Sequence, residues 1–477
     1  AGYTNICQKL LYDTMFEKTV EMMRFHAVGL STWRMFGRHI GDNDLRNIPE
    51  YFQSPGMEHL QGLWPGLPAV CLAAGPSLQK NLRYLLPAAV RNKVAVLSVG
   101  TIYALLHGLG LHPDLVTTID FQRLNWTDQF QYVPLDPDCP LLYLHSTYPQ
   151  TPRRWPGPRF VAENASDTVS WIRKYAEGKK SAATVQTVAH LNVFAALEMG
   201  ANPIILLGQD LSMPVHEHHA AGARAQDASP GETGPDAFLL GKNFQDKPVH
   251  TRHNFLIMKT VFDRIITENP GTTFINASEA GLRLQGAQHM PLKDALDLVR
   301  REDKGQDSRT LRPMMQSIAR KYVPQVKDTF AQDFAQLRQW TDELGDVARA
   351  IIRQTKETET GSILVWDILT RPDRVAAVQA SDMLSAEDTA TDMRLERLKA
   401  VVQLEAGIQT RQAAFALFAI RRFDFLELMA VIPPSTTVID TPLKQYEYNV
   451  GRLVRVATII LEELPAVQHL LREVAQR

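Results

Sequence analysis

The stretch Pro68-Ala-Val-Cys-Leu-Ala-Ala-Gly-Pro-Ser-Leu78 decides the fold of this chain. An apolar run stops at Gly75-Pro76-Ser77 and gives way to a helix-like pattern up to Leu86. This order predicts a buried strand, a tight turn and the N-terminus of a helix. Glycine lets backbone N–H groups approach an anion closely, and proline and serine suit a first helical turn. The turn is equally consistent with a phosphate site and with an ordinary strand-to-helix connection.

Two further strand patterns follow, and each ends in small or acidic residues. Val94–Val99 leads to Thr101, and the next pattern leads to Asp120, with Gln122 just beyond it. In an open parallel sheet, ligands bind in the crevice outside the carboxyl ends of the strands. We therefore expect the Gly75 turn, Thr101 and Asp120 to meet at one site. A carboxylate at Asp120 suits a ribose, a base edge or a metal ion, and equally a structural cap.

Strand-like and helix-like runs alternate from 67 to about 290. The strand patterns are Val70–Leu72, Val94–Val99, Val116–Ile119, Leu141–Leu144, Arg159–Ala162, Pro203–Leu207 and Thr273–Ile275. The clearest helical stretches are Ser181–Met199 and Asn254–Glu268. This alternation predicts the α/β class, with a Rossmann-like, mainly parallel sheet and helices on both of its faces.

Later parts of this region add further candidates. Thr184 and Thr187 at a helix entrance favour either a second phosphate seat or close packing by small residues. The strand ending at Leu207 is followed by Gly208-Gln209-Asp210. Glycines and prolines recur along Met213–Val249. This pattern predicts a long loop, and loops of that length are usually either functional or disordered. The histidines in and after it are His216, His218, His219, His250 and His253, whose spacing matches no metal motif.

The 477 residues suggest several domains. We expect a helical lead-in at 1–66, with apolar residues from Leu10 to Met23 at helical spacing and a loop over Gly41–Gly66. The Rossmann-like domain covers 67–299. An all-α domain at 300–477, divided by Pro372, Pro433-Pro434 and Pro442, has apolar stripes but no catalytic cluster, so its expected role is binding or assembly.

Composition excludes several classes of function. A content of 45% hydrophobic and 22% charged residues is that of a globular protein, and a formal net charge of −1 offers no basic field for nucleic acid or an acidic membrane. No apolar segment approaches the roughly 20 residues needed to span a bilayer. The three cysteines lack metal-ligand spacing and indicate reduced thiols of a cytoplasmic protein. Because the chain begins at Ala1 rather than at a methionine, the question whether an N-terminal segment has been removed stays open.

The ordered set of motifs resembles the motility accessory factor (Maf) flagellin glycosyltransferases. The motifs are Ala74–Leu78, Ser98–Thr101, Pro113–Asp120, Thr187–Ala189, Gly200–Leu211 and Phe274–Gly281. Their wider superfamily includes the 6-hydroxymethylpterin diphosphokinases and is related in fold to bacterial sialyltransferases. The resemblance implies transfer of a nonulosonic acid of pseudaminic, legionaminic or sialic type from its CMP-activated form to Ser or Thr of flagellin, in the cytoplasm before export.

The resemblance also implies roles for individual residues. The nucleotide-binding residues would be Gly75, Pro76, Ser77, Thr101, Asp120, Gln122, Thr187, Gly208 and Asn276, with phosphate nearest Thr187 and Ser77. His250 would be the general base, and Asp210 or Glu279 would take the proton if it is not. His253 and His218 are competing candidates for that role.

Two other functions remain open. One is a magnesium-dependent pyrophosphokinase that acts on a pterin alcohol and holds its metal on Asp120 or Asp210. The other is a non-catalytic flagellin-binding protein. The glycosyltransferase would need no metal and no cofactor beyond its CMP-sugar donor. Flagellin is the expected partner, nucleic acid and membrane are not, and a homo-oligomer is open.

Overall fold

The computed structural model describes residue 32 and residues 35–182, 185–212, 239–301, 305, 307–356 and 442–476. The described residues fall into two compact units, which are treated separately below. Unit 1 comprises residues 46–326, and unit 2 comprises residues 32–45 and those from 327 onward.

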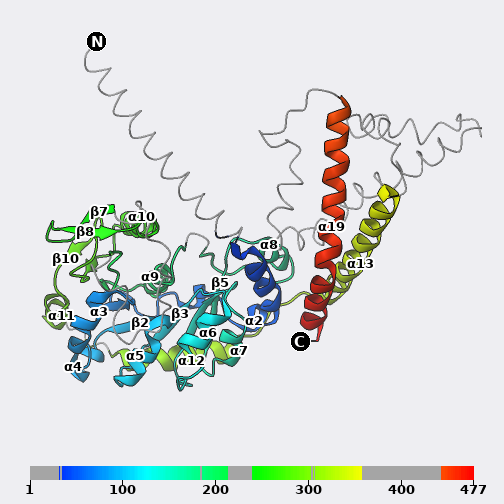
Figure 1. The fold of residues 1–477 in the computed structure, drawn as a ribbon. Coiled ribbons are helices and arrows are strands. Elements are labelled where there is room, and N and C mark those ends of the chain that lie inside the picture. The colour runs from blue at the N-terminus through cyan, green and yellow to red at the C-terminus, as the bar shows by residue number, and fades with distance from the viewer. Residues whose placement is uncertain are drawn as a thin grey trace, which may run out of the picture. The chain divides into compact units, whose positions relative to one another are not determined.

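Unit 1 is built on an eight-stranded sheet whose strand pairings are all parallel (Figure 1). Across the sheet the strands follow the order β10-β9-β6-β1-β2-β3-β4-β5. Their bounds are β1 Ala69–Leu72, β2 Ala95–Val99, β3 Leu115–Thr118, β4 Leu141–Leu144, β5 Arg159–Ala162, β6 Ile204–Leu207, β9 Phe274–Asn276 and β10 Gln288–His289. The chain runs outward from β1 to β5 and then returns to place β6 on the other side of β1. The topological switch point therefore lies between β1 and β6.

Helices cover both faces of this sheet. The crossover connections put helices on both faces, and α12 returns after the reversal to the face of α5 (Figure 1). Figure 1 shows α9 and α10 on the opposite side of the central strands from α5 and α12. The helices of unit 1 are α2 Ile48–Gln53, α3 Pro76–Asn81, α4 Ala88–Arg91, α5 Tyr103–Gly108, α6 Arg123–Gln129, α7 Gln150–Arg154, α8 Asp167–Ile172, α9 Val188–Glu198, α10 His253–Glu268, α11 Leu292–Arg301 and α12 Leu311–Lys321. Short 3-10 turns are η1 Met57–Leu60, η2 Leu82–Tyr84, η3 Gly100–Ile102 and η4 Ser308–Thr310.

The central strands are apolar because both of their faces are covered. Every residue of β1, β2, β3, β4 and β6 is buried. Continuous apolar runs of this kind are typical of parallel sheets. The predicted α/β fold class is confirmed, and the strand patterns coincide with observed strands to within one or two residues.

Three local predictions were wrong. Helix α9 begins at Val188 rather than Ser181, because Ser181 instead forms a bridge beside β5 with Glu163. The loop expected up to Val249 includes part of an antiparallel hairpin of β7 (Leu239–Lys242) and β8 (Pro248–Thr251). The Asn243 side chain shapes its turn by accepting two backbone N–H bonds, a local signal hidden among glycines and prolines. The loop expected over Gly41–Gly66 contains α2 and η1.

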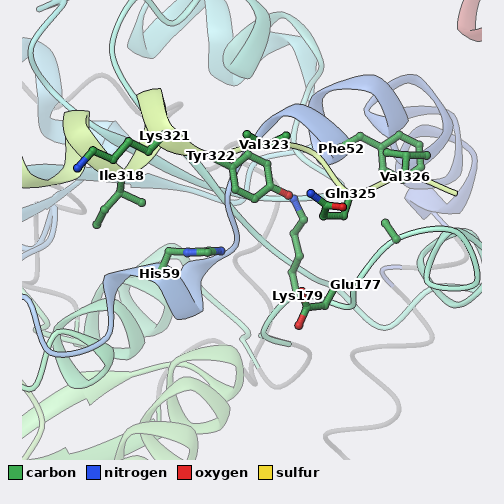
Figure 2. A pocket seen from close by; sticks show the side chains of 11 residues that line it. Phe52, His59, Glu177, Lys179, Ile318, Lys321, Tyr322, Val323, Gln325 and Val326 are labelled. Atoms are coloured by element: carbon green, nitrogen blue, oxygen red, sulfur yellow. The ribbon is translucent and has the colours of Figure 1, made fainter.

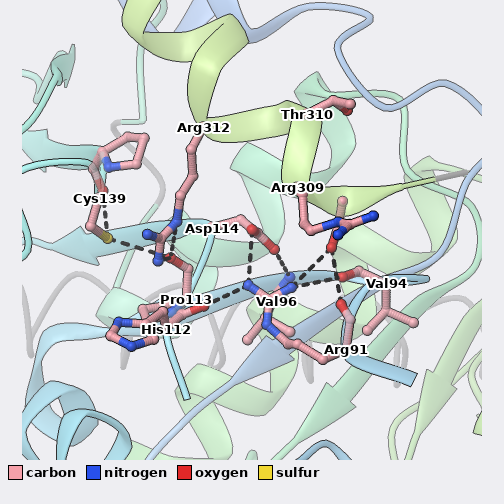
Figure 3. Close-up of polar contacts among 12 residues, drawn as sticks. Arg91, Val94, Val96, His112, Pro113, Asp114, Cys139, Arg309, Thr310 and Arg312 are labelled. Carbon is pink, nitrogen blue, oxygen red and sulfur yellow. Dashed lines mark hydrogen bonds and ion pairs between the residues drawn. The ribbon is translucent and has the colours of Figure 1, made fainter. Parts of the chain in front are cut away.

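Two arginines attach η4 and α12 to the amino-terminal ends of the strands (Figure 3). Arg91 donates to Asp114 (2.9 Å) and to Ser308 Oγ (3.0 Å). Arg312 donates to the Pro113 carbonyl and, at 2.8 Å, to Asp136. Burial raises the pKa of Asp114, and Arg91 opposes that rise. These bonds fix η4 and α12 to this end of the sheet, where the two arginines also line a cavity of about 430 Å³.

Helix α9 packs against β1, β2, β3 and β6, and its His190 fastens it to α10. His190 is fully buried, and its Nε2 lies 3.0 Å from the Met258 carbonyl, while Nδ1 accepts the Gln186 N–H at 3.2 Å. This arrangement fixes the neutral ring with its proton on Nε2. Burial lowers the pKa of His190 to about 3.

His190 should make unit 1 sensitive to acid. The unfolded chain takes up a proton near pH 6.5 and the folded chain only near pH 3, so stability is present above pH 6.5 and is lost as the pH falls. The loss amounts to about 1.4 kcal/mol per pH unit in that window. Urea unfolding between pH 7 and pH 4.5 should show a shallower pH dependence for His190→Gln than for the wild type. His253→Gln, at an exposed histidine, is the control, and equal slopes for all three proteins would contradict the assignment.

Unit 2 is helical in its described residues. Its long helices are α13 (Thr329–Lys356) and α19 (Pro442–Ala475), which pack on each other. Leu337 on α13 and Ile460 on α19 are buried, and Arg38 pairs with the buried Glu463. The all-α prediction is confirmed for these residues, and α19 begins at Pro442 as expected. The helix expected over Leu10 to Met23 and the breakers Pro372 and Pro433-Pro434 lie outside the described residues.

Two further observations concern the whole described chain. Cys71 and Cys139 are buried free thiols, as predicted, and Cys7 lies outside the described residues. Among the helices that the structure describes, none combines the length and apolar character needed to cross a bilayer.

Candidate functional site

The turn between β1 and α3 holds the first predicted site residues. Gly75 has extended backbone, with φ −70° and ψ 160°, and its N–H donates to the Gly208 carbonyl at 2.9 Å. Pro76 is the first residue of α3, and Ser77, next to it, is buried. A Cβ on Gly75 would lie 2.0 Å from Asp210 Oδ2, so the turn lies directly against the chain that follows β6.

Asp210 is a buried carboxylate at the switch point. Its Oδ2 accepts hydrogen bonds from Ser77 N (3.1 Å) and Ser77 Oγ (2.7 Å). Burial raises the pKa of Asp210, and the bonds from Ser77 act against that rise. Its Oδ1 has no hydrogen-bond partner in the described part of the chain, although Asp210 is only 2% exposed. The Nε2 of the neighbouring Gln209 is a buried donor that also has no hydrogen-bond partner among the described residues.

A loop after β9 packs against these two residues. Ser278 Oγ accepts the Gln209 N–H at 2.9 Å, and a backbone N–H of the same loop donates to the Asp210 carbonyl at 2.7 Å. Asn276 is fully buried and uses both ends of its amide inside the loop, including a 3.0 Å bond from the Ser278 N–H. Asn276 therefore shapes the loop. Glu279 lies half-buried in it, next to the Asp210 cluster.

Thr101, Asp120 and Gln122 lie at the carboxyl ends of β2 and β3. Thr101 is half-buried in η3, and Gln122 precedes α6 without a side-chain cap bond. Asp120 Oδ2 accepts Gln129 Nε2 at 3.0 Å. Burial raises the pKa of Asp120, and this bond lowers it. The three residues share an edge of the sheet with Asp210 but belong to its other half.

Helix α9 brings its N-terminus to this edge. Thr187 is its N-cap residue, and the hydroxyl makes no cap bond. Asn192, one turn further along, donates to the carbonyls of Leu72 (3.3 Å) and Leu97 (3.1 Å) near the carboxyl ends of β1 and β2. The first N–H groups of α9 are therefore positioned over the strands that border the switch point. Thr184 lies outside the described residues.

His250 lies on β8, beside the chain that leaves Asp210. Thr251 Oγ1 donates to the Leu211 carbonyl at 2.8 Å and ties β8 to this place. Side chains alternate along a strand, so His250 extends from the opposite face of the hairpin to Thr251. His253 is exposed at the first residue of α10. His216, His218 and His219 lie outside the described residues, and among those described no group of three or more His, Cys, Asp or Glu side chains could hold a metal ion.

Comparison with known proteins covers part of this site. Residues 42–215 match the family model described as 6-hydroxymethylpterin diphosphokinase MptE-like. The match covers about a third of the chain and includes Ser77 and Asp210, whereas the β9 loop and His250 lie outside it. The resemblance inferred from the motifs is thereby confirmed for this superfamily.

A solved structure was also found. The MAf glycosyltransferase from Magnetospirillum magneticum AMB-1 is 12% identical, with a TM-score of 0.48, over 92% of this chain and 62% of that one. This chain thus spans less than two thirds of that protein. No curated protein matches the chain.

Unit 1 brings together some predicted residues more tightly than others. Gly75, Ser77, Gly208 and Asp210 form one bonded cluster at the switch point, which Asn276 and Glu279 adjoin through the β9 loop. Thr101, Asp120 and Gln122 follow the neighbouring strands β2 and β3, and of the three only Asp120 has a described side-chain bond, from Gln129. Thr187 reaches the edge from α9, whereas the His250 side chain extends from the hairpin face opposite to the one that Thr251 ties to Leu211.

Sequence reasoning missed four polar residues of this region. They are Gln129, Asn192, Gln209 and Ser278, all at least 95% buried. Asn192 had a usable signal, because a polar residue inside a helix that is buried on every side must find a hydrogen-bond partner. The others take their meaning from contacts with distant segments, which the sequence does not reveal.

Gly208 is required by the geometry of the cluster. Its φ is +79°, and a Cβ there would lie 2.1 Å from the Ala73 carbonyl oxygen. Gly208→Ala should lower the free energy of unfolding by about 2 kcal/mol or more, from backbone strain and overlap. Gly271→Ala, which meets no atom within 4 Å, should change it by less than about 0.5 kcal/mol. Urea denaturation measures both, and equal stabilities for the two variants would contradict this account.

Proposed function

We propose that this protein is a glycosyltransferase that moves a nonulosonic acid of pseudaminic, legionaminic or sialic type from its CMP-activated donor to Ser or Thr of flagellin. The observation that carries the proposal is the Asp210 carboxylate at the switch point, where Ser77 holds one oxygen and the other has no partner among the described residues. The motif order supports the finer assignment of donor and acceptor.

The buried Asp210 suits recognition of a ligand that donates hydrogen bonds. An unbonded buried acceptor costs about 1 to 3 kcal/mol, which a ligand hydroxyl or N–H can offset. Ribose hydroxyls and the cytosine amino group are such donors. The crevice outside parallel strands at a switch point is also the usual place for a nucleotide.

The donor phosphate fits a different part of the same edge. The N-terminus of α9 offers the positive end of a helix dipole, and the Thr187 hydroxyl is not used as a cap. We place the phosphate there, with the nucleoside toward Asp120 and Asp210. CMP then leaves as a stabilised anion when the bond between the sugar and its phosphate oxygen breaks.

The acceptor hydroxyl must lose a proton as its oxygen attacks the sugar carbon. His250, Asp210 and Glu279 are the candidates for the base. A carboxyl whose pKa is raised toward neutrality is a stronger base than an ordinary one, which favours Asp210 on chemical grounds. No metal ion is required for this step, since the leaving group is already activated.

Nucleotide binding can be tested directly. Ser77→Ala and Asp210→Asn should each weaken CMP binding by about 1 to 3 kcal/mol, which is roughly 5-fold to 150-fold. Ser170→Ala, at an exposed serine on α8, is the control and should bind CMP like the wild type. Isothermal titration calorimetry measures the three affinities, with circular dichroism to verify folding. Unchanged CMP affinity in both site variants would exclude this crevice as the nucleotide site.

Turnover identifies the base. With a CMP-nonulosonic acid and flagellin as substrates, the variant that lacks the base should lose about 10² or more in kcat at saturating donor. His250→Ala and Glu279→Gln should retain donor affinity, whereas Asp210→Asn is judged by kcat at saturating donor, because it also weakens CMP binding. His250→Ala, Asp210→Asn, Glu279→Gln and His253→Ala are compared, with exposed Glu268→Gln on α10 as control. If the wild type binds CMP and flagellin but transfers no sugar, the non-catalytic flagellin-binding function applies instead.

The description of the matched family favours one alternative. The model that matches residues 42–215 is named for a 6-hydroxymethylpterin diphosphokinase, and pyrophosphoryl transfer from ATP requires magnesium. Asp120 and Asp210 are the carboxylates at the edge that would hold it. Calorimetry with ATP in the presence and absence of Mg²⁺ separates the two functions, because metal-dependent ATP binding with no affinity for CMP supports the kinase.

Unit 2 contributes to the same proposal. Its described helices carry apolar faces and no candidate catalytic group, so we assign it the binding of flagellin or assembly with a second copy. In this proposal flagellin is modified in the cytoplasm, before it is exported.

A further inference from the structure

A cavity of unit 1 lies beside the segment that follows β5, four strands away from the switch point. It has a volume of about 440 Å³, within the range of small-molecule sites. Phe52 and Ile318 contribute apolar walls. The rings of His59 and Tyr322 meet edge to face with centroids 5.6 Å apart (Figure 2).

The charged group of this cavity is Lys179. Its side chain is buried, and its ammonium donates to the carbonyls of Tyr51 and Ser54 at the C-terminal end of α2. A lysine ammonium has three N–H donors, so one is left after these two bonds within the part of the chain that the structure describes. Figure 2 shows the nitrogen of Lys179 directed toward the Tyr322 hydroxyl and the Gln325 amide, inside the cavity.

The surroundings of Lys179 disfavour a cationic ligand. The ammonium lies 4.5 Å from the ring centroid of Tyr51 and 5.2 Å from that of Tyr322, so it already occupies the aromatic faces that would attract a cation. Burial lowers the pKa of Lys179 to about 7, and Glu58 and Glu163 oppose that change. A bound anion would favour the ammonium form.

Glu163 does not compete for the remaining donor. Its oxygens accept the Tyr51 hydroxyl (2.6 Å), the Lys179 backbone N–H (2.7 Å) and Arg173 Nε (2.7 Å). The titratable and charged groups around the ammonium are Tyr51, Glu58, His59, Glu163, Arg173, Glu177, Lys321 and Tyr322. The cavity thus offers one cationic donor among largely apolar walls. Such a site suits a ligand with a single negative charge better than a phosphate dianion.

The two carbonyl bonds also favour a non-covalent ligand. An amide or imine formed at Lys179 would have at most one N–H and would lose a bond to Tyr51 or Ser54. An ionic contact keeps all three donors engaged. We propose that this cavity binds a monocarboxylate with an apolar or aromatic body, whose carboxylate accepts the third N–H of Lys179 while the body packs against Tyr322 and Phe52.

A matched pair of probes tests the charge requirement. Indole-3-acetate and its neutral isostere indole-3-acetamide are titrated into the full chain by calorimetry. At pH 6 the carboxylate should bind at least about 10-fold tighter than the amide, which is about 1.4 kcal/mol. This preference is complete below pH 7 and falls as the pH rises past it, because the free amine loses the proton that the anion needs. Equal affinities at pH 6, or no binding of the carboxylate at about 10 mM, would overturn the proposal.

Two variants locate the preference. Lys179→Gln should abolish the difference between the two probes. Lys321→Gln should retain it within about 3-fold, because Figure 2 shows that this lysine directs its amine away from Lys179. If Lys179→Gln does not fold, Lys179→Met, which keeps the length of the side chain and removes its charge, replaces it in the same comparison. Retention of the preference in folded Lys179→Gln would also refute the site.

Discussion

The hydrogen bonds from Ser77 to Asp210 join the two halves of the sheet at the place where the chain reverses direction. The parallel register pairs Leu72 with Leu207, so the segments that leave β1 and β6 emerge side by side. Gly75 and Gly208 let these segments approach closely, because neither has room for a Cβ. A buried carboxylate must be bonded to remain in such a place, and Ser77 supplies both its N–H and its hydroxyl.

Much of this arrangement follows from local sequence. Apolar runs that end in small or acidic residues predicted the central strands, and parallel pairing placed Thr101, Asp120 and Asp210 at one edge. The individual contacts could not be predicted in the same way. Ser77 and Asp210 are 133 residues apart, and nothing near either residue specifies the other as its partner.

The errors have physical causes of the same kind. The stretch before α9 has helical composition, but Ser181 pairs beside β5, and this tertiary contact outweighs local propensity. The β7–β8 hairpin depends on a turn closed by the Asn243 side chain and on Asp246 with a φ of +58°. The coordinates show this turn clearly, but a sequence rich in glycine and proline gives little basis for predicting it.

Three buried carboxylates show what separates the scaffold from the candidate site. Both oxygens of Asp114 are bonded, to Arg91 and to the Val96 N–H, and both oxygens of Glu163 are bonded as well. These bonds offset the cost of burying the two carboxylates, so neither group has an unbonded oxygen to offer a ligand. Asp210 has both of its bonds on one oxygen and none to the other among the described residues. The same chemical group therefore stabilises the chain at two places and is left available for a ligand at the third.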